Sequence, residues 1–138
     1  MTTQAADVTL VVPAVPDSIA VIRQTVSGIC EALGADARTV GDIKLAATEA
    51  CTNVVLHAYA SGDVGTIEVG AYATGAELRL LVRDRGAGMT PAPMVESLGL
   101  GLPLIAALTS TLTIVEPDDG GTELSMTFAL HETPSDRE

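Results

Sequence analysis

Residues 48–59 read TEACTNVVLHAY and lie within an apolar, alanine-rich segment whose spacing predicts a helix. Three polar residues, Glu49, Asn53 and His57, recur there at every fourth position. Positions four apart on an α-helix differ by only about 40° around its axis, so the three share one side. That side is either an ordinary solvated face or the wall of a pocket. The scarcity of other ionisable groups around it favours the pocket.

A carboxylate and an amide on one helix face suit the chemistry of phosphate transfer. The side-chain oxygen of Asn53 is a hard ligand of the kind Mg²⁺ accepts, while phosphates and water supply its other ligands. Glu49, one turn earlier, is placed to take a proton from an attacking hydroxyl or water. We interpret His57 as orienting or packing rather than catalysing.

The rest of the chain predicts the element order β-α-α-β-β-loop-α-β-β. Gly34 is expected to end the first helix and Asp36 to cap the second. Strand pairs joined by tight turns favour an α/β two-layer sandwich, a mostly antiparallel mixed sheet with three helices on one face. A chain of 138 residues suits a single domain, here 1–138 and ordered over about 8–130. The expected elements are strands 8–14, 66–74 and 76–84, helices 17–34, 37–60 and 98–110, and two strands within 111–130.

The composition excludes several classes of partner. A net charge of −11 with a single lysine, Lys44, argues against direct nucleic-acid binding and against anionic membranes. A polyanionic ligand must then be held by backbone N–H groups, helix ends, a metal ion or arginine. The chain start lacks a basic, apolar leader, and no run is long enough to span a bilayer, which predicts a cytoplasmic protein. Cys30 and Cys51 are expected to be buried, reduced thiols.

A carboxylate followed by glycines ends the second predicted strand of the central hairpin. The segment RDRGAGM (83–89) places Asp84 at the strand end, with Gly86 and Gly88 after it. Glycines there let the backbone approach a ligand closely, and the carboxylate can accept a hydrogen bond from an exocyclic amine. On its own, the segment is better explained as an ordinary turn after a strand.

Two more glycine-containing segments follow. GLGLP (99–103) opens a helix, whose unpaired N–H groups and partial positive charge attract phosphate. GGT (120–122) lies between two strands and is, alone, a hairpin turn. The Walker A pattern is missing, because Lys44 does not follow a glycine-rich loop. A nucleotide therefore requires a different scaffold.

The order and spacing of four segments are more specific than any one of them. They resemble the N, G1, G2 and G3 boxes of the GHKL ATP-binding superfamily (gyrase B, heat-shock chaperone, histidine kinase and MutL). Within it the chain most resembles the anti-sigma-factor serine/threonine kinases of the RsbW and SpoIIAB type, over about residues 8–130. The four segments are EACTNVVLHAY, DRGAG, GLGLPLI and GGTELSMTF.

The resemblance implies a Bergerat-type ATP-binding fold, with ATP and Mg²⁺ as cofactors. It implies an ATP-dependent serine protein kinase that sequesters a sigma factor and phosphorylates an anti-anti-sigma (STAS) protein. Relatives of this kind are commonly homodimers. The same resemblance implies that residues 89–98 form a lid over ATP.

The resemblance also implies residue roles. Glu49 matches the catalytic base, Asn53 the Mg²⁺ ligand beside the phosphates, and Asp84 the residue that reads the adenine amino group. The other expected ATP-binding residues are Gly86 and Gly88 in the adenine-side loop, Gly99, Leu100, Gly101 and Leu102 at the phosphate-side hinge, and Thr122, which supports the hydrogen-bond network around Asp84.

One departure from the family leaves alternatives open. The segment 89–98 contains no lysine or arginine, whereas some relatives place a basic residue there, near the γ-phosphate. Stabilisation of the negative charge in the transition state would then depend on Mg²⁺, the helix end or an arginine such as Arg85. The first alternative is a non-catalytic ATP-binding regulator that sequesters a partner. The second is an ATPase module of a histidine kinase.

Overall fold

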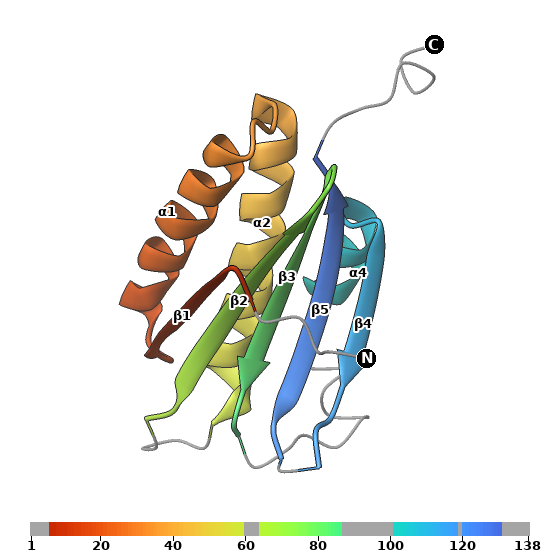
Figure 1. Ribbon diagram of the computed structural model, residues 1–138. Coiled ribbons are helices and arrows are strands. Elements are labelled where there is room, and N and C mark those ends of the chain that lie inside the picture. Colours follow the sequence, from red (N-terminus) through yellow and green to blue (C-terminus); the bar gives the residue numbers. More distant parts are fainter. Residues whose placement is uncertain (1–5, 60–63, 87–100, 119, 131–138) are drawn as a thin grey trace.

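The computed structural model describes residues 6–59, 64–86, 101–118 and 120–130. Figure 1 shows a twisted sheet with α1, α2 and α4 on one face, the two-layer arrangement expected from the sequence. The elements are β1 (Val8–Pro13), α1 (Pro16–Ala32), α2 (Ala37–Asn53), the π-helical η1 (Val54–Ala58), β2 (Thr66–Thr74), β3 (Glu77–Asp84), α4 (Gly101–Leu108), β4 (Thr111–Val115) and β5 (Thr122–Ala129).

The sheet has the strand order β1-β2-β3-β5-β4. All four pairings are antiparallel, which confirms the mostly antiparallel sheet and leaves no parallel pair among the described strands. Because β5 pairs antiparallel with β3, the end of β3 adjoins the start of β5. The register consequently sets Asp84 opposite Thr122.

The core lies between the sheet and the helices. Strand residues alternate between a buried face and a more exposed face, as in β3, where Leu78, Leu80 and Val82 are buried. Ile22 and Val26 of α1 are also fully or almost fully buried. Leu, Ile, Val and Ala dominate this core because the chain holds only three aromatic residues, one Phe and two Tyr.

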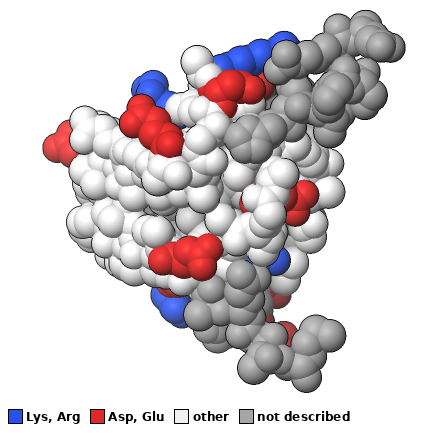
Figure 2. Space-filling view, turned by 45° about the horizontal axis from the view of Figure 1, so that its top comes forward, with Lys and Arg blue, Asp and Glu red and all other residues white. Residues whose placement is uncertain are grey.

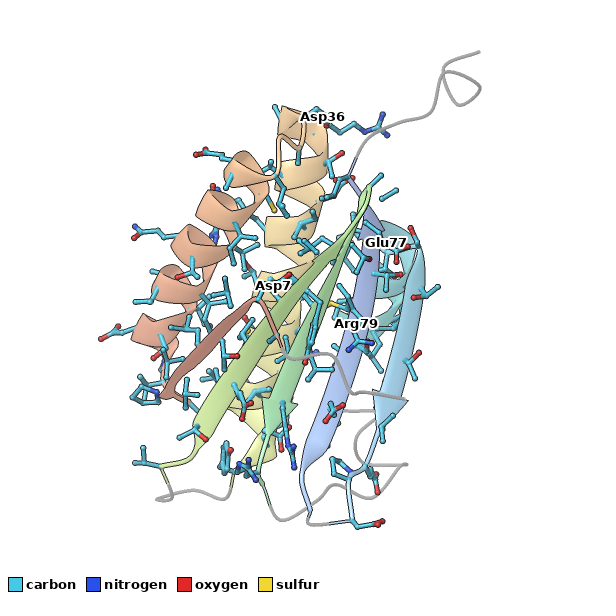
Figure 3. The ribbon with its side chains drawn as sticks, viewed as in Figure 1. Asp7, Asp36, Glu77 and Arg79 are labelled. Atoms are coloured by element: carbon cyan, nitrogen blue, oxygen red, sulfur yellow. The ribbon has the colours of Figure 1, made fainter. Side chains whose placement is uncertain are left out.

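The ends of the first two helices follow the expected signals. Asp36, at the start of α2 in Figure 3, accepts a hydrogen bond from the Thr39 N–H at 2.8 Å. Gly34 follows α1 with a φ of 76°, a left-handed conformation that glycine adopts without strain.

The second helix differs from its expected form. A single α-helix over 37–60 was predicted, but the α-helix ends at Asn53 and continues as the π-helical turn η1. The α-helical spacing did not reveal the wider turn, because Val54 and Ala58 are both buried and match an α-helical pattern as well. At this π-helical turn, Ala58 and Tyr59 contact residues in β2 and directly after β3.

The two cysteines are buried and unpaired, as expected. Burial raises the pKa of the Cys51 thiol to about 12, which keeps it protonated and unreactive. Over the described residues, we find no helix with the length and apolarity needed for a bilayer crossing. On the face shown in Figure 2, acidic side chains occupy several separate places.

Candidate functional site

A shallow hollow, open at its mouth, lies where α2, η1, β3, α4, β4 and β5 meet. In Figure 1 this is the lower half of the molecule, at the end of β3 and the start of β5. Asn53, Asp84, Leu102 and Thr122, which the sequence places in four separate segments, all line it. The remaining lining residues are Ala50, Val54, Ala58, Val82, Ile114 and Leu124. A mostly apolar wall with a few convergent polar groups is typical of a small-molecule site.

Asp84 is the buried carboxylate of this hollow, with 6% of its surface exposed. Its Oδ1 accepts a hydrogen bond from the Gly86 N–H at 3.0 Å. Burial raises the pKa of Asp84, while the hydrogen bonds from the Gly86 and Thr122 N–H groups partly oppose that rise. Two backbone donors leave the carboxylate with capacity to accept a further hydrogen bond from a ligand.

Asp84→Asn is expected to change the pH dependence of stability. Because the folded-state pKa of Asp84 is raised, its contribution to stability is complete below the unfolded pKa of about 3.9 and is lost as pH rises through the folded pKa. The Asn variant cannot ionise, so its stability relative to the wild type should be higher at pH 7 than at pH 3. Urea unfolding at both pH values measures this, and a pH-independent difference would contradict it.

Thr122 contributes a buried hydroxyl that has no hydrogen-bond partner within the described part of the chain. Its Oγ1 lies in the wall of the hollow and makes no hydrogen bond to any described group. An unsatisfied buried hydroxyl costs about 1–3 kcal/mol. A polar ligand in the hollow would recover that cost, so the orphaned oxygen fits a site built for a bound molecule.

The start of α4 lies directly against the Asn53 side chain. A Cβ atom added to Gly101 would stand 2.9 Å from Asn53 Nδ2 and 3.3 Å from Oδ1, so glycine permits the close approach. The unpaired N–H groups that open a helix carry partial positive charge. The hollow therefore combines an amide side chain and a helix N-terminus on one side with Asp84 and Thr122 on the other.

Two glycines let the segments around Asp84 meet. A Cβ on Gly86 would lie 2.0 Å from the carbonyl oxygen of Ala58, and a Cβ on Gly121 would lie 2.0 Å from the carbonyl oxygen of Asp84. Gly121 also has a φ of +85°. Glycine at both positions allows η1, β3 and β5 to converge at this end of the sheet.

Other predicted residues lie elsewhere. Glu49 is half-buried on α2, one turn before Asn53, but is not among the described residues that line the hollow. His57, half-buried in η1, is not among them either. Gly88, Gly99, Leu100 and the predicted lid 89–98 lie outside the described residues.

Sequence reasoning missed two features of the site. Ile114, on the short strand β4, lines the hollow, although nothing in its strand pattern distinguishes it from a core residue. Tyr59, the last residue of TEACTNVVLHAY, makes three hydrogen bonds beside the hollow. The sequence signal for it is a tyrosine at the end of a helical segment rich in small residues.

Comparison with known proteins identifies relatives over most of the chain. Residues 12–128 match the family described as the histidine kinase-like ATPase domain. The chain is 36% identical to the serine-protein kinase RsbW of Halalkalibacterium halodurans, over 88% of this chain and 82% of that protein. It is 30% identical to the serine-protein kinase RsbW of Bacillus subtilis, over 87% of this chain and 83% of the relative.

Solved structures show the same fold. The crystal structure of the RsbU and RsbW domains of Rv1364c from Mycobacterium tuberculosis matches with a TM-score of 0.71 and 28% identity. The match covers 91% of this chain and 33% of that one, so the chain spans about a third of the larger protein. The SiaB–SiaC complex from Pseudomonas aeruginosa, at 17% identity and a TM-score of 0.58, is similar in fold alone and covers 91% of both chains.

Proposed function

The chain belongs to the RsbW family of serine-protein kinases, within the histidine kinase-like ATPase domain family, and from this we propose that it is an ATP-dependent serine protein kinase and anti-sigma factor. It sequesters a sigma factor and phosphorylates a serine of an anti-anti-sigma (STAS) protein. The observation that carries the proposal is the meeting of Asn53, Asp84 and Thr122 around one hollow.

The residues present fit an adenine nucleotide. In the proposed complex the Asp84 carboxylate accepts a hydrogen bond from the adenine amino group, and Thr122 Oγ1 gains the partner that it lacks. We also assign Gly86 and Gly88 to binding of the base, Gly88 from the sequence alone. The phosphates would be bound toward the start of α4, where Gly101 and Leu102 lie. We assign Gly99 and Leu100 to phosphate binding as well, from the sequence alone.

Phosphoryl transfer requires a metal ligand and a base, and we assign these to α2. Asn53 Oδ1 would hold Mg²⁺, which would supply neutralisation of the phosphate charge. No group of three or more His, Cys, Asp and Glu residues is gathered in the described part, and one protein ligand plus phosphates and water is a common arrangement for Mg²⁺. Glu49, one turn away, accepts the proton of the attacking serine hydroxyl.

The direct test is a phosphorylation assay with the anti-anti-sigma protein from the same organism. With Mg-ATP, we expect phosphoserine on that protein, detected by mass spectrometry, and stoichiometric capture of the sigma factor by the unreacted kinase. Absence of both phosphoserine and sigma-factor binding would refute the proposal.

A non-catalytic regulator is the second candidate, and two observations favour it. The segment 89–98 contains no lysine or arginine. Arg85, the arginine next to Asp84, lies in an ion pair with Glu68, at 3.8 Å between Nη2 and Oε1. A nucleotide-dependent, tight complex with the sigma factor and no phosphoserine over many hours would favour this regulator.

Removal of Mg²⁺ is expected to weaken ATP binding at least about tenfold. Free ATP is a polyanion approaching a chain of net charge −11, and without the metal it also loses its bridge to Asn53. Calorimetric titration with Mg²⁺ and with EDTA measures the difference. Equal affinities would contradict the role proposed for Asn53.

We further propose that residues 8–130 act as one domain and that the protein works as a homodimer in the cytoplasm. Light scattering should give twice the chain mass of 14.1 kDa. A mass of one chain at micromolar concentration would contradict the dimer.

A further inference from the structure

The hydroxyl of Tyr59 is fully used in hydrogen bonds next to the hollow. It donates to the Thr66 carbonyl at 2.6 Å and accepts from the Thr66 N–H at 3.1 Å. It also accepts from the Arg85 N–H at 2.8 Å. One donated and two accepted bonds are the whole capacity of a hydroxyl group.

These bonds join three segments that are separate in the sequence. Tyr59 follows the last residue of η1, Thr66 begins β2, and Arg85 follows the last residue of β3. The ring packs against Gly65 so closely that a Cβ there would lie 2.0 Å from ring carbons. Because π-helical turns often occur at functional sites, the wide turn before Tyr59 fits a specialised placement of this ring.

The Tyr59 bond acts on the turn that carries Asp84. Arg85 stands between Asp84 and Gly86, and the Gly86 N–H donates to Asp84 Oδ1 at 3.0 Å. The hydrogen bond from the Arg85 N–H to Tyr59 therefore restrains Asp84 and Gly86, the two residues on either side of Arg85. Tyr59 itself is not among the described residues that line the hollow, so its effect on a ligand is indirect.

We propose that Tyr59 is a positioning residue that sets the Asp84 carboxylate for recognition of the adenine amino group. This rests on the proposed function, in which Asp84 accepts a hydrogen bond from that amine. Without the hydroxyl, the Arg85 N–H loses its partner and the short turn from Asp84 to Gly86 relaxes. The Asp84 carboxylate is then misaligned with the adenine amino group, while the contacts of the protein with the ribose and the phosphates of ATP remain.

The experiment compares two nucleotides and two Tyr→Phe variants. Tyr59→Phe keeps the ring and is expected to weaken binding of Mg-ATP about tenfold. Binding of purine riboside triphosphate, which lacks the amino group, should change less than about twofold in the same variant, because the lost contact is absent from that complex. The measured quantity is thus the ratio of the two dissociation constants, which a general loss of stability would not alter.

Tyr72→Phe is the matched control, since it removes the hydroxyl of the only other tyrosine in the chain. Tyr72 lies on β2 opposite Arg79 of β3, whose guanidinium is 4.4 Å from the centre of the Tyr72 ring. In Tyr72→Phe, the ratio of the dissociation constants for the two nucleotides should equal that of the wild type. An unchanged ratio in Tyr59→Phe, or an equal loss for both nucleotides, would overturn the role of Tyr59.

Two further results separate this inference from the proposed function. If the wild type fails to bind ATP, the proposed function itself is refuted. If the wild type binds both nucleotides equally, recognition of the adenine amino group by Asp84 is refuted, and the role of Tyr59 with it. If Tyr59→Phe does not fold, hydrogen exchange on the wild type gives the answer. The Arg85 amide should be protected like the strand amides of β3, and rapid exchange there would overturn the inference.

Discussion

Glu49→Gln is expected to lower phosphoserine formation about 10²- to 10⁴-fold, the usual contribution of a positioned general base. Glutamine has nearly the same size and shape as glutamate and still forms hydrogen bonds, but it cannot take the serine proton. Because Glu49 is half-buried on α2 outside the lining of the hollow, ATP affinity should stay within about twofold of the wild type.

The control for this variant is Glu77→Gln, which makes the same chemical change at an exposed position. Glu77 starts β3, at the opposite end of the strand from Asp84, and Figure 3 shows it far from the lower end of the sheet. Its phosphorylation rate should match the wild type. Phosphate transfer at an undiminished rate in Glu49→Gln would exclude Glu49 as the base, whereas loss of ATP binding would make it a binding residue instead.

Gly121→Ala is expected to destabilise the fold by about 3 kcal/mol or more. Two costs add at this position. The φ of +85° is unfavourable for alanine, and the new Cβ would stand 2.0 Å from the carbonyl oxygen of Asp84, a backbone atom that cannot rotate away. Relief requires β3 and β5 to separate at the end where Asp84 and Thr122 face each other. Chemical denaturation and ATP titration of the same sample should both report the loss.

The matched controls are Gly28→Ala and Gly41→Ala. These glycines lie within α1 and α2, and a Cβ on either would meet no atom within 4 Å. Alanine should stabilise each helix by about 0.5–1 kcal/mol, because it has the higher helix propensity. A destabilisation equal to that of Gly121→Ala at either helical position would contradict the steric argument.

Much of the fold could be predicted from local patterns. Alternation of apolar residues marks β2, β3 and β5, and the cap at Asp36 and the stop at Gly34 mark the ends of helices. Each of these signals depends on neighbours a few residues apart, which the chain order alone supplies. The recurrence of Glu49, Asn53 and His57 predicted the wall of a pocket, but of these three only Asn53 is among the described residues that line the hollow.

The resemblance to known ATP-binding boxes added the expectation that separate segments meet, and Asn53, Asp84, Leu102 and Thr122 do line one hollow. The distances between residues of the site could not be predicted from the sequence. The orphaned Oγ1 of Thr122 depends on β5 pairing with β3, and the closeness of Gly101 to Asn53 depends on how α4 packs on α2. Such contacts join residues dozens of positions apart.

The sequence by itself determined which residue types stand on which faces of the helices and strands, because helical and strand periods are local properties of the chain. Only the tertiary structure decided that α2 ends in a π turn and that the Tyr59 hydroxyl holds Thr66 and Arg85. The physical reason is that a hydrogen bond between distant segments forms only after packing has brought them within about 3 Å. No local pattern records that distance.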